Sequence, residues 1–237
     1  MSFAMRRCIT LTLPCLIAVW FAAPTTAEEK AVSPNRARVL ILGDSISIGY
    51  TATVRKELED VAIVVRAMRV GKIENCAGTT NGLKQVDRWL AQDGGKWDVI
   101  HFNFGLHDLK RVDPKTGRNS NSAGDPRQAE PDKYEEQLRT ITKKIIAASG
   151  TNARIIYAFT TPVPKAVKPR RDIEDPARYN AIAKKVMAEL KVQINDLYSF
   201  ALPQLAEIQR PANVHFTPEG SQRLGKQVAA VIREALK

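Results

Sequence analysis

Two side chains that lie far apart in the chain have the chemistry of a nucleophile and its base. Ser45 follows the apolar run 39–42, from which Gly43 and Asp44 separate it. His215 lies 170 residues further on, just before the last predicted helix. A serine hydroxyl is hardly ionised at neutral pH and needs a base before it can attack a carbonyl carbon. Together the two residues would supply nucleophilic acyl transfer.

The position of Ser45 allows two interpretations. A serine where a buried parallel strand turns into a helix lies at the carboxyl edge of a sheet, where open α/β sheets bind ligands. The helix N-terminus brings free backbone N–H groups and a positive dipole end, which would stabilise an oxyanion. In the second interpretation Ser45 only caps the helix, since serine and aspartate are the usual N-caps.

Buried strands alternate with helices along the chain, and this pattern predicts where the reactive residues meet. Apolar or β-branched runs predict strands at 38–42, 62–68, 97–104, 154–160 and 192–198. Helical patterns predict helices at 48–60, 83–91, 134–148, 176–191, 202–209 and 218–236. The alternation predicts an α/β fold with a parallel sheet covered on both faces. The loops after the first three strands would then open on one edge of the sheet.

The first 27 residues have the form of a secretory signal peptide. Arg6 and Arg7 precede a mostly apolar stretch that ends near Ala23. This stretch is shorter than the roughly 20 residues of a membrane span, which favours cleavage near Ala27 over an uncleaved anchor. Cleavage would leave Cys76 as the single cysteine, a small buried residue and not part of a disulfide. We expect a signal peptide at 1–27, a short linker at 28–37, a single domain at 38–237, and a periplasmic or secreted protein.

The charge of the chain bears on its partners. The formal charge is +11, or +9 without the two arginines of the predicted signal peptide, which favours an acidic partner. No alternation of basic and aromatic residues marks a nucleic-acid surface, so an anionic glycan or a basic solubility surface fits better. A basic cluster in the predicted loop 165–175 is either a solvated face or a glycan contact; its members are Lys165, Lys168, Arg170 and Arg171.

Four blocks of sequence together resemble the SGNH/GDSL hydrolases, a family of serine esterases, lipases and carbohydrate deacetylases. The blocks are Gly43-Asp44-Ser45-Ile46-Ser47, Asn75-Cys76-Ala77-Gly78, Asn103-Phe104-Gly105-Leu106-His107-Asp108 and Val214-His215-Phe216-Thr217-Pro218-Glu219-Gly220. One such block is a weak signal, but four in this order over 38–236 are specific. The resemblance implies a three-layer α/β/α sandwich around a parallel, flavodoxin-like sheet of about five strands.

The resemblance also implies roles for individual residues. Ser45 would attack the ester carbonyl, and His215 would take the serine proton and pass it to the leaving alcohol. The backbone N–H groups of Ser45 and Gly78, with the side chain of His107, would form the oxyanion hole. Further candidates for substrate binding or for orienting the catalytic groups are Asp44, Asn75, Thr79, Asp108 and Asn213.

Two positions depart from the family pattern. The family usually has an asparagine in the oxyanion hole where this chain has His107, whose donation depends on tautomer and pH; Asp108 beside it would help to fix the tautomer. The family's triad aspartate lies three residues before the histidine, where this chain has Ala212. A backbone carbonyl or a carboxylate from elsewhere would then orient His215, unless the uncharged Asn213 does so.

The sequence therefore predicts an exported serine ester hydrolase that removes acyl groups, with an acetyl ester of a carbohydrate as the expected substrate. Two alternatives share the fold. One is a glycan-binding protein without hydrolytic activity, which Ala212 would favour. The other is an acyltransferase that passes the acyl group from Ser45 to a sugar hydroxyl. No spacing of metal ligands and no phosphate-binding loop is present, so we expect no cofactor, no metal, no nucleic acid and no stable membrane insertion after cleavage.

Overall fold

The computed structural model describes Met1, residues 35–150 and residues 153–237; the rest of the predicted signal peptide lies outside the described residues. Five of its strands form a parallel sheet in the order β2-β1-β5-β6-β7. They are β1 (Ala37–Leu42), β2 (Ala62–Arg66), β5 (Val99–Phe102), β6 (Arg154–Ala158) and β7 (Gln193–Asn195). This is the predicted flavodoxin-like order. The chain first adds β2 on one side of β1 and then continues with β5 on the other side. In open α/β sheets, ligands bind at such a reversal, here between the carboxyl ends of β1 and β5.

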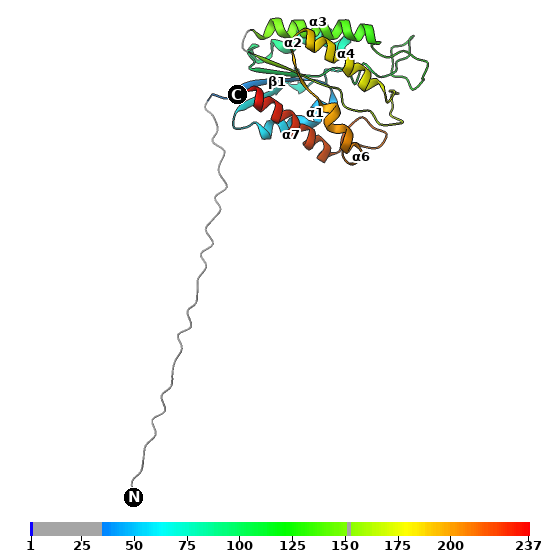
Figure 1. Ribbon diagram of the computed structural model, residues 1–237. Coiled ribbons are helices and arrows are strands. Elements are labelled where there is room, and N and C mark those ends of the chain that lie inside the picture. The colour runs from blue at the N-terminus through cyan, green and yellow to red at the C-terminus, as the bar shows by residue number, and fades with distance from the viewer. Residues whose placement is uncertain (2–34, 151–152) are drawn as a thin grey trace. The chain divides into compact units, whose positions relative to one another are not determined.

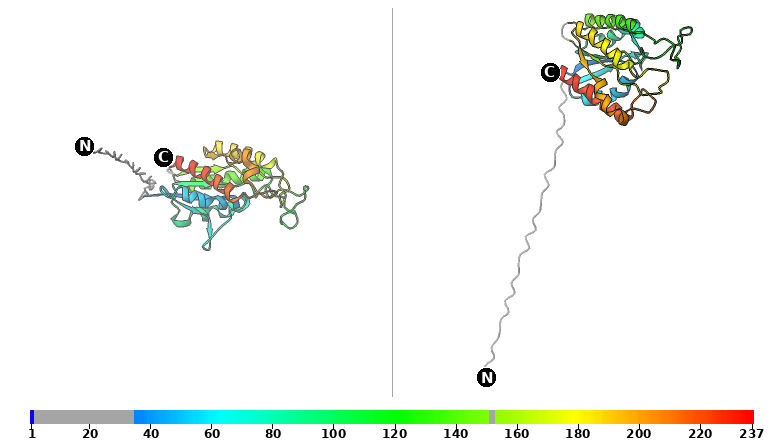
Figure 2. Two further views of the ribbon diagram at one scale, coloured as in Figure 1. Left: turned by 90° about the horizontal axis from the view of Figure 1, so that it is seen from below. Right: turned by 45° about the vertical axis from the view of Figure 1, so that its right-hand side comes forward.

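Helices cover both faces of the sheet, which confirms the predicted three layers (Figure 1). On one face α1 (Ser45–Glu57) packs against α7 (Pro218–Ala235), with the short α5 (Leu197–Ala201) and α6 (Leu205–Ile208) beside α7. On the other face lie α2 (Thr79–Leu90), α3 (Pro131–Ser149) and α4 (Asp175–Glu189). Figure 2 shows the sheet between these two groups of helices, with long loops projecting at one end. No helix among the described residues has the length and apolar character needed to cross a bilayer.

Several predicted bounds were wrong, and glycine explains one of the errors. α2 begins at Thr79 and not at 83. The prediction treated the segment between the glycines at 78 and 82 as part of a loop, whereas the structure has helix there. Gly82 lies inside the helix, where an added Cβ would come within 2.7 Å of the Phe104 ring. The glycine therefore serves close packing and not a turn.

Two short elements differ in kind from the prediction. Residues 68–73, predicted as a strand end and a loop, form the hairpin of β3 (Met68–Arg69) and β4 (Lys72–Ile73). Residues 197 and 198, predicted as the end of a strand, belong to α5, because the Asp196 carboxylate accepts a hydrogen bond from the Ser199 N–H and starts a helix.

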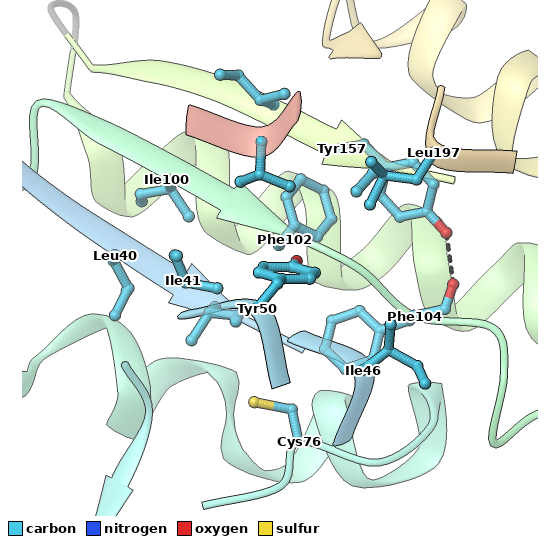
Figure 3. Packing of buried hydrophobic residues seen from close by; sticks show 14 of the residues in the cluster. Leu40, Ile41, Ile46, Tyr50, Cys76, Ile100, Phe102, Phe104, Tyr157 and Leu197 are labelled. Atoms are coloured by element: carbon cyan, nitrogen blue, oxygen red, sulfur yellow. Dashed lines mark hydrogen bonds between the residues drawn. The ribbon is translucent and has the colours of Figure 1, made fainter. Parts of the chain in front are cut away.

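The core holds the loop after β5 in position. Figure 3 shows Ile46 and Tyr50 of α1 together with Phe102 of β5 among the buried side chains. In the same view a dashed line marks the hydrogen bond that the Tyr157 hydroxyl donates to the carbonyl oxygen of Phe104. The Tyr134 hydroxyl donates to the same oxygen at 3.1 Å. These two bonds fix the chain just before the segment that carries His107.

Cys76 lies in this core with no exposed surface, as predicted for a small buried residue. Burial raises the pKa of its thiol to about 12, so the reactive thiolate is scarce at neutral pH.

Gly225 permits the close approach of α7 to α1, and its replacement tests this contact. A Cβ at this position would lie 2.6 Å from the Cβ of Thr53 and 2.9 Å from the carbonyl oxygen of Tyr50. We expect Gly225→Ala to lower the free energy of unfolding in urea by about 1–3 kcal/mol, since the helices must move apart. Gly124→Ala is the control: its nearest atom would be the Ser122 hydroxyl at 3.8 Å. Equal changes in the two variants would contradict this explanation.

Candidate active site

Ser45 is the first residue of α1, and its hydroxyl is not used to cap the helix. The N-cap is Asp44, whose buried carboxylate accepts a hydrogen bond from the Ile46 N–H at 2.9 Å. The interpretation of Ser45 as a mere cap was therefore wrong. Asp44 shapes the turn that presents the serine, and its predicted part in substrate binding does not fit its burial.

The structure brings Ser45 and His215 together across 170 residues. The Ser45 Oγ lies 2.8 Å from Nε2 of His215. On the far side of the ring, Nδ1 lies 2.7 Å from the Oδ1 atom of Asn213. The same Oδ1 accepts a second hydrogen bond, at 2.9 Å, from the backbone N–H of His215. Serine, histidine and asparagine thus form a continuous chain of hydrogen bonds.

The backbone N–H of His215 decides the tautomer of the ring. An N–H can only donate, so the Asn213 atom that faces it must be the amide oxygen and not the amide nitrogen. An oxygen can only accept from Nδ1, which therefore carries the ring proton. Nε2 is then unprotonated and accepts from the Ser45 hydroxyl. This is the tautomer in which a histidine acts as a general base towards serine.

A tight turn before α7 places these groups. Asn213 N–H donates to the carbonyl of Arg210 at 3.3 Å, and Arg210 N–H donates to the carbonyl of His215 at 3.0 Å. Ala212, at the sequence position where the family has an aspartate, has a φ of 51° in this turn. The Thr217 hydroxyl caps α7 by accepting from the Gly220 N–H. The sequence left three ways to orient His215 open, and the structure shows the one with Asn213. Among the described residues, no backbone carbonyl or carboxylate bonds to Nδ1 of His215.

The loop before α2 is joined to the nucleophile turn. The Cys76 N–H donates to the carbonyl of Gly43 at 3.1 Å. An added Cβ at Gly78 would lie 2.7 Å from Oδ1 of Asp108, so only glycine fits there. In the part of the chain that the structure describes, neither the N–H of Ser45 nor that of Gly78 donates to another group. Both donors are free for a ligand.

His107 lines the same cleft as Ser45 and His215. Burial lowers the pKa of the His107 imidazole below its ordinary value, partly offset by the negative charge of Asp44. The ring is therefore neutral at neutral pH and has one N–H to donate.

Asp108 does not fix the tautomer of His107, which corrects the prediction. Its fully buried carboxylate accepts from the Thr79 N–H at 2.9 Å and from the Thr79 hydroxyl at 2.6 Å. These bonds anchor the start of α2. Thr79 is buried as well, and the prediction that it contacts substrate was also wrong. Asn75 does line the cleft, and its Oδ1 accepts from the Ala77 N–H at 2.9 Å.

Two buried residues complete the surroundings. Arg66, at the end of β2, was not predicted as a site residue; it donates to the Ser47 hydroxyl at 2.8 Å and to the Gly43 carbonyl at 3.0 Å. The sequence signal was an arginine inside an otherwise apolar strand. His101 is fully buried, with Nε2 3.2 Å from the side-chain nitrogen of Asn195, so its role is structural.

The cleft around Ser45 has a volume of about 620 Å³. Two long loops form much of its wall, and ion pairs join them: Arg111 bonds to Asp172, and Arg127 bonds to Asp175 at 2.6 Å. The lining residues are Ser45, Asn75, Leu106, His107, Lys110, Asn119, Ala166, Lys168, Pro169, Arg171, Ala212, Asn213, Val214 and His215. Lys110 and Asn119 belong to a loop whose path could not be read from local sequence.

This arrangement of motifs has a family counterpart. Residues 41–223 match the GDSL-like lipase/acylhydrolase family. The chain belongs to this family. It is therefore a hydrolase of ester bonds, as predicted.

Solved structures agree in fold. The lipase/acylhydrolase from Enterococcus faecalis is similar with a TM-score of 0.64 at 20% identity, over 84% of this chain and 96% of that one. The acetyl xylan esterase AlAXEase has a TM-score of 0.61 at 15% identity, over 82% and 99%. The acetylxylan esterase Axe2 from Geobacillus stearothermophilus has a TM-score of 0.61 at 18% identity, over 87% and 96%. No curated protein sequence matches the chain.

The buried carboxyl of Asp108 predicts a pH dependence of stability. Burial raises its pKa to about 6, against about 3.9 in an unfolded chain. The folded protein holds this proton between pH 4 and 6 while the unfolded chain releases it, so the contribution of Asp108 to stability is present below about pH 4 and is lost as the pH rises through about 6. We expect urea unfolding to show that wild type loses about 3 kcal/mol relative to Asp108→Asn between pH 4 and 7.

Asp113→Asn supplies a control of opposite sign. Backbone N–H groups of Thr116 and Lys115 lower the pKa of this exposed carboxylate. Wild type should therefore gain stability relative to Asp113→Asn as the pH rises through the acid range. A difference between wild type and Asp108→Asn that stays flat with pH would show that Asp108 is ionised throughout.

Proposed function

We propose that the protein hydrolyses acetyl esters of a carbohydrate through a covalent acyl-enzyme on Ser45. The observation that carries the proposal is the hydrogen-bond chain from Ser45 through His215 to Asn213. His215 Nε2 takes the hydroxyl proton as the Ser45 oxygen attacks the ester carbonyl carbon. The imidazolium then gives this proton to the leaving alcohol as the ester C–O bond breaks. Water then attacks the acyl carbon as the same nitrogen takes its proton, and the imidazolium returns this proton to the Ser45 oxygen as the Oγ–acyl bond breaks and the acid leaves.

The oxyanion formed in each half of the reaction needs donors that are already in place. The free N–H groups of Ser45 and Gly78 supply two of them in this proposal, and the N–H of neutral His107 supplies a third. Each donor contributes roughly 3 kcal/mol to lowering the barrier. Because His107 stays neutral at neutral pH, its contribution is a hydrogen bond and not a charge.

Asn213 performs part of what an aspartate does in a serine triad. It holds the ring and selects the tautomer, which is the part that an ordinary aspartate-to-asparagine change destroys. It supplies no negative charge to the imidazolium. The proposed enzyme therefore has correct geometry with weaker electrostatic support.

Acetylated carbohydrate is the proposed substrate because two of the similar structures are named as acetyl xylan esterases. An open cleft of about 620 Å³ has room for a sugar unit. Export fits such a substrate, and the form of residues 1–27 supports it. Sequencing the N-terminus of the mature protein from a secreting host tests export; an intact Met1 would contradict it.

Replacement of Ser45 tests the nucleophile. We expect Ser45→Ala to lower kcat/KM for p-nitrophenyl acetate by at least about 1,000-fold, because the acyl-enzyme cannot form. A fluorophosphonate probe should add to Ser45 of wild type, as seen by peptide mass spectrometry, and not to the variant. Ser122→Ala, in an exposed loop, is the matched control. Equal rates for wild type and Ser45→Ala would refute the mechanism.

Replacement of Asn213 separates orientation from charge. Asn213→Ala removes the acceptor for both N–H groups of His215, and we expect kcat to fall by about 10- to 1,000-fold. Asn213→Asp keeps the acceptor and adds a charge that stabilises the imidazolium, so kcat should rise, by roughly tenfold. Unchanged kcat in Asn213→Ala would show that the ring needs no support from this side chain.

Partition of the acyl group between water and added sugar, read by product analysis, distinguishes a hydrolase from an acyltransferase.

A further inference from the structure

One wall of the catalytic cleft is positively charged. Lys110, Lys168 and Arg171 line it together with Ser45 and His215. None of the described residues that line this cleft is an aspartate or a glutamate. A ligand that reaches Ser45 therefore meets a lining with positive side chains and no carboxylate, while the buried carboxylate of Asp44 acts on Arg171 without forming an ion pair with it.

Arg171 is the member of this wall that most requires explanation. It is only 8% exposed. Its Nε donates to the Leu106 carbonyl at 2.8 Å, and its Nη1 donates to the Pro169 carbonyl at 3.1 Å. Among the described residues no carboxylate forms an ion pair with Arg171, and Nη2 donates to no group. The bond to Leu106 holds the guanidinium beside the segment that carries His107.

Three other arginines of these loops are paired. Arg111 and Arg170 bond to Asp172, and Arg127 bonds to Asp175. The carboxylates of Asp172 and Asp175 are thus occupied by other arginines. Arg171 is the neighbour of Arg170 in sequence, yet it faces the cleft and stays unpaired.

An unpaired guanidinium at this depth is costly. A buried charge without an ion-pair partner loses much of its hydration, and more distant charges restore only part of the lost free energy. Burial lowers the pKa of Arg171 to about 10, against the opposing effect of Asp44. Burial also lowers the pKa of Lys110, and the charge of Arg171 lowers it further. A bound anion would stabilise both cations at once.

We propose that Arg171, with Lys110 and Lys168, binds an anionic group of the substrate, a carboxylate or a sulfate, next to the ester that Ser45 attacks. The inference rests on the proposed function and narrows its substrate to an ester of an acidic sugar. A planar guanidinium suits both groups, since its N–H donors match two oxygens of an anion. The lysines add charge that needs no fixed geometry.

Three acetylated probes test the preference. They are a fully O-acetylated methyl glucuronoside, the uronamide of the same compound, and the matching glucoside sulfated at its primary hydroxyl. The uronamide has nearly the shape of the uronate without its charge. We expect acetate release from at least one charged probe to show a kcat/KM about tenfold or more above that for the uronamide. The charged probe with the higher kcat/KM shows whether the site prefers a carboxylate or a sulfate.

Variants assign the preference to Arg171. We expect Arg171→Gln to bring the ratio of charged to neutral kcat/KM close to one, whereas Arg170→Gln, the matched control, keeps the wild-type ratio. Lys168→Ala removes an exposed side chain and should lower the ratio in part. If Arg171→Gln does not fold, two other measurements test the inference. The ratio of charged to neutral kcat/KM should fall in Lys168→Ala, and the ratio of wild type should fall as the salt concentration rises.

The outcomes separate this inference from the proposed function. Equal kcat/KM for all three probes, with cleavage that still requires Ser45, would overturn the inference and leave the esterase mechanism standing. A ratio that survives in Arg171→Gln and in Lys168→Ala would also overturn it. Failure to cleave p-nitrophenyl acetate or any probe in a Ser45-dependent way would overturn the proposed function itself.

Discussion

The carbonyl oxygen of Gly43 is the point on which the geometry of the site depends. It accepts from the Cys76 N–H at 3.1 Å and from Nη2 of Arg66 at 3.0 Å. One atom thus joins the nucleophile turn, the loop that leads to Gly78, and the end of β2. Position 43 must be glycine, because a Cβ would lie 2.8 Å from the Ser47 hydroxyl, which Arg66 also bonds. A buried arginine is costly, and its contacts here set the relative position of nucleophile and oxyanion donors before substrate arrives.

The fold separates chemistry from recognition. The reacting groups stand on the ends of β1 and β5 and at the start of α7, which the parallel sheet and its core hold rigidly (Figure 1). The positive wall comes from loops that ion pairs of Arg111 and Arg127 join to each other. Loops tolerate changes in sequence and length far better than strands do. A common catalytic frame can therefore accept different substrates through its loops alone.

The sequence was sufficient to predict the sheet, the family and the pairing of Ser45 with His215, because short motifs and strand patterns are local signals. It was insufficient where a side-chain contact decides. Asn213 was a candidate, but its double acceptor role depends on a turn in which Ala212 has a positive φ. Asp108 adjoins His107 in sequence yet bonds Thr79, because both residues lie in the turn 106–109, where neighbouring side chains point in different directions. Arg171 belonged to a basic cluster in the sequence, and local sequence does not show which of its side chains form ion pairs.

The amide of Asn213 also has a consequence for the enzyme in acid. A triad carboxylate takes up a proton below about pH 4 and then loses its charge. An amide oxygen does not titrate in this range, so it accepts from Nδ1 and from the backbone N–H of His215 at any pH the fold survives. The support that holds the histidine ring is therefore independent of pH, whereas the support that a carboxylate gives changes when it is protonated.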